Sequence, residues 1–520
     1  MTTDQPTWAP PGPGSWLNDR AYKRTTYTVP MQEVIAVAMG PEGFGQWTAR
    51  YGVPLSHLDV GIVNGYAYQQ PVIDFATLPQ RAERAEVATV ERTWLADAER
   101  WHGHHRADRT AANLALQDVD VDSLDDAGLA AHLREAWSNG LAGSRLHFDL
   151  IGAIAVTCGR FVAAAEDWGI DHDVALRALA GASPASLDAA HAFALAGAAA
   201  RVAGVDRPDS LDDIRAASPQ AAQALDEAMR THGWRIIGAA DLDGETLAER
   251  PDIVLQLATS PDPEVAPAPS LPAWRDQVPE AERDRFDSLL TEARTGYALR
   301  DDNAGITMAW SLGLVRRALL AAGRRLAKQG GLAEPDHVFD MTIEETAALL
   351  DGSAEPTAAE VSSRAAARRQ ADRLEPPPLL GEPPMPPPDS SMFPPAMGAL
   401  TRAVMTHQRL MFEPRRTATG IGDTRVTGRA VVALDATDAL ARVEPGDVLV
   451  TTMTAPGFNA ALGVVAGLVT EQGGPMCHAA IMARELGIPT VLGLSGAVTS
   501  IPDGATVVVD PVAGTVEVVR

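Results

Sequence analysis

The chain has 520 residues, of which 46% are hydrophobic, and a formal net charge of -25 at pH 7. This length predicts two to four domains, each able to bury a core. Nucleic-acid backbones and anionic membrane surfaces both recruit Lys and Arg, so the acidic balance argues against both classes of partner. We therefore expect a protein that binds neither nucleic acid nor membrane.

Three features of the sequence indicate a cytoplasmic protein. The two cysteines, Cys158 and Cys477, are too few for a disulfide framework and are typical of a reducing compartment. Residues 1–16 lack the basic and apolar regions of a signal peptide. The most apolar stretch, residues 150–158, is bounded by charged residues, and we predict a buried helix too short to span a bilayer.

Residues 31–370 are predicted to form mainly helices, because Ala, Leu, Arg and Glu dominate and apolar positions recur at helical spacing. The run at residues 312–331 is a clear case. Its apolar residues share one face, its arginines occupy the other, and two glycines end the helix. Residues 1–15, which are rich in Pro and Gly, are predicted to be an irregular arm.

A proline-rich segment at residues 374–400 separates the predicted domains. Proline fixes φ and removes a backbone donor, so this segment is predicted to be an extended, semi-rigid linker and neither a helix nor a central strand. The domains on its two sides are 1–373 and 401–520. Nearly all of the net negative charge falls before residue 401, which supports this division.

The C-terminal domain is predicted to be α/β, which makes the fold class multidomain, with a mainly α-helical N-terminal domain before it. Val and Thr are frequent in its strand-like runs, and Gly, Pro and Asp separate them. Helices are predicted at residues 460–466 and 478–486. The predicted strands are Gly428–Leu434, Asp447–Thr451, Gly467–Thr470, Ile488–Leu492, Thr506–Val509 and Thr515–Val519.

The segment from Thr470 to Pro489 carries the chemistry. It is predicted to be a strand, a turn at Gly473 and Gly474, and a helix that begins at His478. The free N–H groups and positive dipole end of a helix N-terminus favour a bound anion. A neutral imidazole is a nucleophile near neutral pH, so a histidine here is suited to carry a phosphoryl group. A lone histidine at such a place more often caps or packs.

The sequence GGPMCHAAIMARELGIPTVLG, residues 473–493, resembles the phosphohistidine signature of the phosphoenolpyruvate-utilising enzymes. Residues 446–462 and 503–519 resemble other parts of the same domain. The resemblance implies a swivelling domain in which His478 carries a phosphoryl group between two active sites. Many relatives have a threonine where this chain has Met476, so a hydroxyl that helps hold the phosphoryl group is missing. The matching positions are Gly473, Gly474, His478, Ala483, Arg484, Glu485, Gly487 and Pro489.

The resemblance also implies roles for the neighbours of His478. Gly473, Gly474 and Cys477 would form the loop at the phosphoryl group, and Arg484 would help to neutralise it. Pairing of Arg484 with a nearby acid on the helix surface is the alternative. The Cys477 thiol is expected to be structural and not reactive.

Short pieces of residues 1–400 resemble the substrate-binding region of rifampicin-phosphotransferase-like proteins and of phenylphosphate synthase. These pieces are residues 231–255, 297–310 and 332–350. They imply side chains that orient a hydroxyl or meet the phosphoryl group. Helix caps, salt bridges and solvated faces are the alternative explanation for the same residues. The candidates are His232, Arg235, Arg300 and Asn303.

The function that the resemblance implies is a dikinase-like phosphotransferase. Relatives charge the histidine with an ATP-grasp domain or a phosphoenolpyruvate-binding barrel. We recognise neither in the sequence, and no P-loop pattern occurs. We therefore expect a separate ATP-grasp subunit, which holds ATP and Mg²⁺, to phosphorylate His478. This chain would then pass the group to the hydroxyl of a small alcohol or phenol.

Two other hypotheses remain open. The chain could be a phosphocarrier or regulatory binding protein without its own small-molecule substrate, or a degenerate member that is never phosphorylated. No metal site is expected on this chain. His102, His104 and His105 lack Cys or acidic partners at ligand spacing and are predicted to lie in a surface turn.

Overall fold

The computed structural model describes residues 6–19, 25–237, 241–260, 262, 272–384, 386, 388–412 and 418–519. The chain divides into two compact units. The first comprises Met1–Gly152, Ala240–Gly244 and Asn303–Thr401. The second comprises Ala153–Ala239, Glu245–Asp302 and Arg402–Arg520. The C-terminal α/β part therefore shares its unit with helices from the middle of the chain.

The first unit contains an antiparallel sheet that the prediction of mainly helices missed. Its strand order is β2-β3-β1-β4. Asn64 and Gly65, both at positive φ, form the turn between two of the strands, and Asn-Gly is a hairpin signal that the sequence already contained. Trp16, Tyr66 and Tyr68 are buried in the core of this sheet. The strands are β1 (Ser15–Asn18), β2 (His57–Val63), β3 (Tyr66–Val72) and β4 (Leu379–Gly381).

The proline-rich segment lies against this sheet. Strand β4 pairs antiparallel with β1 at the sheet edge, where prolines cost no ladder bonds. The Tyr68 hydroxyl donates to the carbonyl of Pro377 at 2.9 Å. Helix α17 (Pro395–Phe412) begins at a proline, where a missing N–H has no helical partner anyway. The prediction that residues 374–400 contain no helix is thus wrong at their C-terminal end.

Helix α14 confirms the prediction for residues 312–331. It spans Ser311–Gln329 and ends at Gly330, whose φ is 80°. Arg316, one of the arginines predicted for the face opposite the apolar residues, is buried and donates to the Leu242 carbonyl at 2.9 Å. The other helices that lie in the first unit are α1 (Val29–Met39), α2 (Phe44–Tyr51), α3 (Leu78–Glu91), α4 (Thr93–Arg100), α5 (Arg106–Gln117), α15 (Ile343–Leu350) and α16 (Ala358–Ala371).

The apolar stretch near residue 150 belongs to α6 (Asp126–Asp167), a helix of 42 residues. Length and composition alone would allow this helix to cross a membrane, so the prediction that it is too short is wrong. Of its apolar 18-residue window, 78% is buried inside the structure. That burial is typical of a core helix. Helices α6, α13 (Arg283–Ala304) and α17 each contribute residues to both units.

The second unit contains a seven-stranded sheet with the order β11-β10-β6-β7-β8-β9-β5. Strands β6 to β9 are neighbours and run parallel, and the chain between consecutive strands contains a crossover helix. The six predicted strands are confirmed to within two residues, whereas the edge strand β5 was missed. The strands are β5 (Thr419–Ile421), β6 (Val426–Val432), β7 (Val448–Thr451), β8 (Gly467–Thr470), β9 (Thr490–Leu492), β10 (Thr506–Asp510) and β11 (Thr515–Val518).

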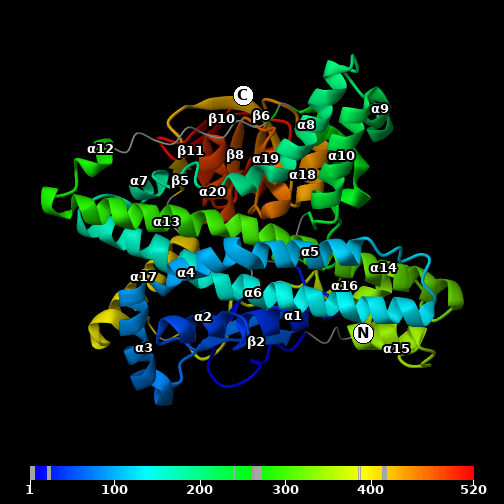
Figure 1. Ribbon diagram of the computed structural model, residues 1–520, viewed down its shortest axis with the longest axis horizontal. Coiled ribbons are helices and arrows are strands. Elements are labelled where there is room, and N and C mark those ends of the chain that lie inside the picture. Colours follow the sequence, from blue (N-terminus) through cyan, green and yellow to red (C-terminus); the bar gives the residue numbers. More distant parts are fainter. Residues whose placement is uncertain are drawn as a thin grey trace. The chain divides into compact units, whose positions relative to one another are not determined.

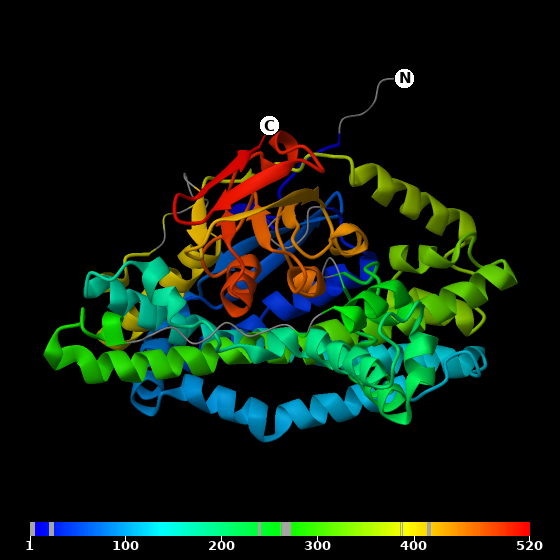
Figure 2. The same cartoon turned by 90° about the horizontal axis from the view of Figure 1, so that it is seen from above.

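Both faces of this sheet are covered. Leu449 and Leu468 pack with the crossover helices, and Val450 and Val469 pack on the opposite face with α21 (Ala497–Ser500). Figure 2 shows the crossover helices gathered along one side of the strands. They are α18 (Ala436–Arg442), α19 (Asn459–Leu462) and α20 (His478–Leu486).

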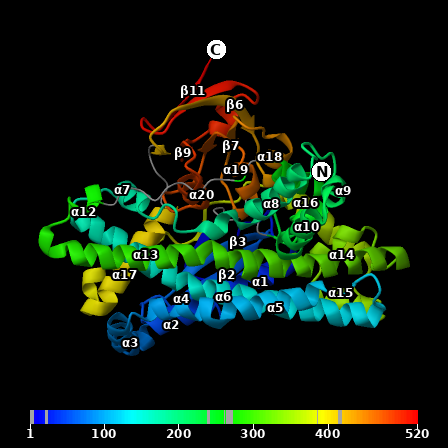
Figure 3. The ribbon, with the colours of Figure 1, turned by 45° about the horizontal axis from the view of Figure 1, so that its top comes forward.

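The core under the crossover helices continues into helices from the middle of the chain. Figures 1 and 3 show α8 and α10 beside α18 and α19. The prediction of a mainly α-helical part followed by an α/β domain is confirmed. The helices of this middle region are α7 (His172–Arg177), α8 (Asp188–Val202), α9 (Leu211–Ala217), α10 (Pro219–His232), α11 (Pro251–Thr259) and α12 (Pro272–Arg275).

Candidate functional site

Two glycines shape the turn between β8 and α20. Gly473 has φ 125°, a conformation that favours glycine, and a Cβ there would lie 2.7 Å from the Cys477 sulfur. A Cβ on Gly474 would lie 2.1 Å from the Leu410 carbonyl oxygen. The Met476 N–H donates to the same carbonyl at 3.3 Å. The turn therefore packs closely against the end of α17, and Gly474 makes that approach possible.

Gly474→Ala is expected to lower the free energy of unfolding by about 2 kcal/mol or more, because the Leu410 backbone must move to admit the methyl group. Chemical denaturation measures this difference. Gly103→Ala is the control, since a Cβ there meets nothing within 4 Å. An unchanged stability of Gly474→Ala would show that the turn is not held against α17.

His478 is the first residue of α20, and its ring is held from both sides. Its Nδ1 lies 2.8 Å from the Thr454 hydroxyl, and its Nε2 lies 2.7 Å from Oδ1 of Asn459. Thr454 follows β7, and the histidine follows the adjacent parallel strand β8. The contact therefore forms at the carboxyl edge of the sheet, where ligand sites of parallel sheets lie.

The amide of Asn459 decides which nitrogen of His478 carries the proton. Its Nδ2 donates to the Ser186 carbonyl at 3.0 Å, so its Oδ1 faces the ring. An amide oxygen only accepts, and Nε2 must therefore be the donor. It follows that Nδ1 accepts a hydrogen bond from the Thr454 hydroxyl.

The ring of His478 is neutral. Burial lowers its pKa to about 3. The Asp301 carboxylate acts in the opposite direction, and the Arg300 guanidinium adds to the lowering. An imidazole with a pKa this far below 7 stays uncharged throughout the physiological range.

Two serines join the site to two carboxylates, those of Asp301 and Glu485. Ser183 and Ser186, at η3 (Pro184–Leu187), both donate to Asp301 on α13, with a distance of 3.1 Å for Ser183. The Ser183 N–H also faces Oε2 of Glu485 at 3.4 Å. Burial raises the pKa of Glu485 to about 7, while its other oxygen has no hydrogen-bond partner among the described residues. The site thus contains a carboxyl that titrates near neutral pH.

Arg484 is buried in the turn itself. Its Nη1 donates to the Pro475 carbonyl at 2.6 Å, which ties α20 to the loop before it. The same loop contains Cys477 at the N-cap of α20, and burial raises the pKa of this thiol. Gly473, Gly474, Cys477 and Arg484 are therefore brought together with His478, and their part in holding a phosphoryl group stays a prediction.

Arg300 is brought to the site, whereas Asn303 is not. The Arg300 charge acts on the pKa of His478 and of Cys477. Asn303 is three residues further along α13 but belongs to the first unit. There it is fully buried, and its Oδ1 lies 2.7 Å from His147 Nδ1.

His232 and Arg235 lie together at the end of α10. The His232 ring is buried and contacts Phe193 edge-on. Burial lowers its pKa to about 2, and the Arg235 charge adds to the lowering. This environment is that of a core histidine, and a role in substrate binding stays a prediction for both residues.

Most of the C-terminal domain matches a known protein family. Residues 443–514 match the family described as PEP-utilising enzyme, mobile domain. The match includes β7 to β10, the two glycines and His478. Residues 443–514 are therefore similar to the mobile domain of PEP-utilising enzymes.

Similarity to curated relatives extends beyond the mobile domain. A rifampicin phosphotransferase from Streptomyces sviceus is 30% identical over 349 residues, which is 61% of this chain and 37% of the relative. A phosphoenolpyruvate synthase from Aeropyrum pernix is 46% identical over 90 residues, 17% of this chain and 11% of the relative. A rifampicin phosphotransferase from Bacillus cereus is 45% identical over 93 residues, which is 18% of this chain and 10% of the relative. The chain thus spans little more than a third of the Streptomyces protein.

The two hydrogen-bond partners of His478 were not predicted from the sequence. Thr454 and Asn459 lie in the block that was noted only for its family resemblance. Their position after β7 was a usable signal, because the carboxyl ends of adjacent parallel strands meet. The missing hydroxyl at Met476 also has an explanation, since that side chain is buried in the core and the Thr454 hydroxyl contacts the ring instead.

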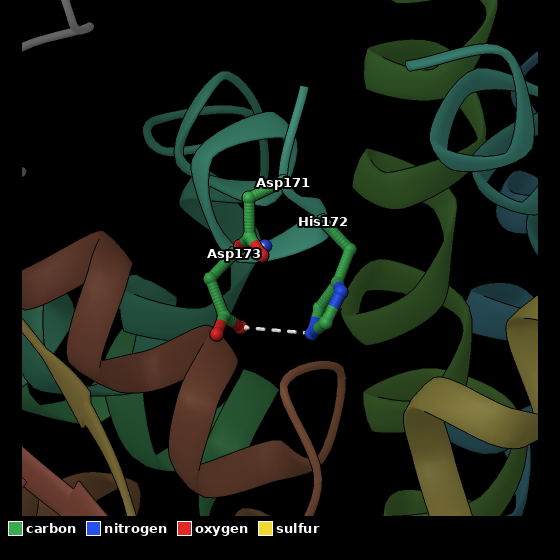
Figure 4. Close-up of side chains that lie close together, drawn as sticks. All are labelled: Asp171, His172 and Asp173. Atoms are coloured by element: carbon green, nitrogen blue, oxygen red, sulfur yellow. Dashed lines mark hydrogen bonds and ion pairs between the residues drawn. The ribbon is translucent and has the colours of Figure 1, made fainter. Parts of the chain in front are cut away.

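Asp171, His172 and Asp173 lie close together outside the mobile domain (Figure 4). Asp171 is the N-cap of α7, and its carboxylate accepts from the Asp173 N–H at 2.8 Å. These are the contacts of a helix cap, and we assign no metal to them. The predicted surface turn at residues 102–105 is wrong, because η2 (Trp101–His105) is a π-helical stretch between α4 and α5.

Proposed function

We propose that this chain belongs to a phosphotransferase in which the mobile domain carries a phosphoryl group on His478 to the hydroxyl of a small organic molecule. The observation that carries the proposal is the place of this imidazole. It is neutral, begins α20 at the carboxyl edge of parallel strands, and lies beside the serine and carboxylate groups at η3 and α13. The relatives named as phosphotransferases support the reaction class.

The surroundings of the ring favour Nε2 as the nitrogen that accepts the group. The Nδ1 side is enclosed with the buried Thr454, whereas the Nε2 side meets the half-buried Asn459. In the first step the ring proton moves from Nε2 to Nδ1, the Nε2 lone pair attacks phosphorus, and the bond from phosphorus to the donor oxygen breaks. In the second step a substrate hydroxyl attacks, and the P–N electron pair returns to the ring.

The second step needs a base and a positive charge. Asp301 is the candidate to take the proton of the attacking hydroxyl, because two serine hydroxyls already orient its carboxylate. Arg300 is the candidate to stabilise the charge on the transferring group. Catalysis would come from positioning and charge neutralisation.

The donor proposed for the first step is ATP with Mg²⁺, held by an ATP-grasp partner chain in the cytoplasm. Phosphoenolpyruvate is the competing donor, and it is part of the name of the synthase relative. The acceptor proposed is an alcohol or phenol.

Labelling tests the proposal directly. The chain is incubated with Mg²⁺, a candidate ATP-grasp partner and ATP labelled with ³²P at either the β- or the γ-phosphorus, and separately with ³²P-phosphoenolpyruvate. We expect label that is stable in base and labile in acid, as for phosphohistidine, and that leaves the chain when an alcohol or phenol acceptor is added. Absence of such label with either donor contradicts the proposal.

A further inference from the structure

We propose that Asn459 is a positioning residue that holds His478 in one tautomer until a phosphoryl group arrives. The inference rests on the proposed function. Asn459 lies between His478 and the carbonyl of Ser186, which is outside the matched mobile domain. It therefore connects the reactive ring to the neighbouring helices.

The orientation of this amide is fixed from both ends. Turned over, its Oδ1 would face the Ser186 carbonyl oxygen, and two acceptors cannot form a hydrogen bond. As observed, it accepts from Nε2 at 2.7 Å and donates to Ser186 at 3.0 Å. The proton is then on Nε2, and the Nδ1 lone pair is engaged by the Thr454 hydroxyl at 2.8 Å. Neither nitrogen offers a free lone pair while this arrangement lasts.

Charging at Nε2 requires the other tautomer. Nδ1 then carries the proton and donates to Thr454, whose hydroxyl can accept as well as donate. The ring gains and loses one proton, so its net charge is unchanged, and Nε2 presents its lone pair to phosphorus. The bond from phosphorus to the donor's bridging oxygen breaks, and that oxygen leaves with the electron pair.

A phosphoryl group on Nε2 and the observed Asn459 contacts exclude each other. The Oδ1 atom would face anionic oxygens, so the amide must turn and present its N–H groups to them. That rotation ends the hydrogen bond to Ser186. The uncharged mobile domain is thus bound to the helices by a contact that the charged form lacks.

Two substitutions at Asn459 should have different effects on the rate of phosphoenzyme formation. Asn459→Asp keeps an acceptor for Nε2–H but adds a negative charge, and we expect phosphoenzyme formation to slow by about tenfold or more. Asn459→Ala removes the acceptor that favours the Nε2–H tautomer. We expect this variant to be charged at least as fast as the unchanged chain and to lose its label to water several-fold faster.

The tautomer itself is read from ¹⁵N chemical shifts of chain labelled in histidine, with His478 assigned by the signal that disappears in His478→Asn. We expect the Nε2–H pattern in the unphosphorylated chain. Asn459→Ala should shift the pattern toward Nδ1–H, and Asn459→Asp should raise the pH at which the ring becomes an imidazolium. A purely structural residue would move none of these signals.

Gln256→Glu is the matched control. Gln256 on α11 also donates a side-chain amide to a carbonyl across the same boundary, at 3.2 Å from the Val443 oxygen, but it does not contact His478. We expect its labelling rate and its tautomer to be unchanged. If the labelling rate falls equally in both Asn459 variants and in Gln256→Glu, Asn459 is only a packing contact and the inference is overturned.

The inference and the proposed function can fail separately. If the unchanged chain shows the Nε2–H tautomer but takes no label from either donor, the phosphotransfer proposal fails and the assignment of the tautomer stands. If it takes the label but shows Nδ1–H before charging, the role given to Asn459 is wrong and phosphotransfer stands.

Discussion

His478→Asn is expected to abolish the acid-labile label and to lower phosphoryl transfer by at least about a thousandfold, as for other removals of a covalent nucleophile. Asparagine keeps polar atoms near Thr454 and Asn459 but provides no nitrogen nucleophile. Labelling with both donors, followed by acid and base treatment, measures the effect.

The control for this prediction is His191→Asn. His191 lies on α8 in the same unit, partly exposed, and it pairs with Asp262 and not with the site. Its variant should be labelled like the unchanged chain, and both variants should unfold at the same denaturant concentration as that chain. Acid-labile label that persists on a folded His478→Asn protein would place the phosphoryl group on another residue.

Glu485→Gln is expected to change the pH dependence of stability by up to about 3 kcal/mol. The pKa of Glu485 is about 7 in the folded chain, against its ordinary pKa of 4.5 in the unfolded chain. Between these values the folded state binds more protons than the unfolded state, so stability falls as pH rises. The contribution is full below pH 4.5, is lost by about pH 7, and changes no further above that. The magnitude follows from about 1.4 kcal/mol for each pKa unit.

Denaturant unfolding at pH 5 and at pH 8 measures this effect. As the pH rises, the free energy of unfolding of the glutamine variant should increase relative to that of the unchanged chain, because the variant has no buried carboxyl to ionise. Glu444→Gln is the control, since Glu444 is largely exposed in the same domain and should leave the pH profile unchanged. Parallel profiles for Glu485→Gln and the unchanged chain would mean that Glu485 is already ionised without cost.

Local patterns in the sequence determined the strands, the glycine turn and the helix start of the C-terminal part. Runs rich in Val and Thr, separated by Gly, Pro and Asp, predicted β6 to β11 apart from their exact ends. The two glycines and the helix start placed His478 correctly in α20. Turn conformation, helix initiation and strand preference are set mainly by residues close in the chain, so they can be read without knowing the fold.

Only the tertiary structure decided what surrounds the imidazole. Thr454 and Asn459 reach the ring because β7 and β8 are parallel neighbours. Asn459 in turn donates to Ser186 of η3, which lies far earlier in the chain. The tertiary structure also decided the place of the proline-rich segment. Its strand β4 pairs with β1, which lies near the other end of the first unit's sequence. These contacts form because apolar surfaces far apart in the sequence bury one another. Local sequence preferences do not determine which surfaces pair in this way.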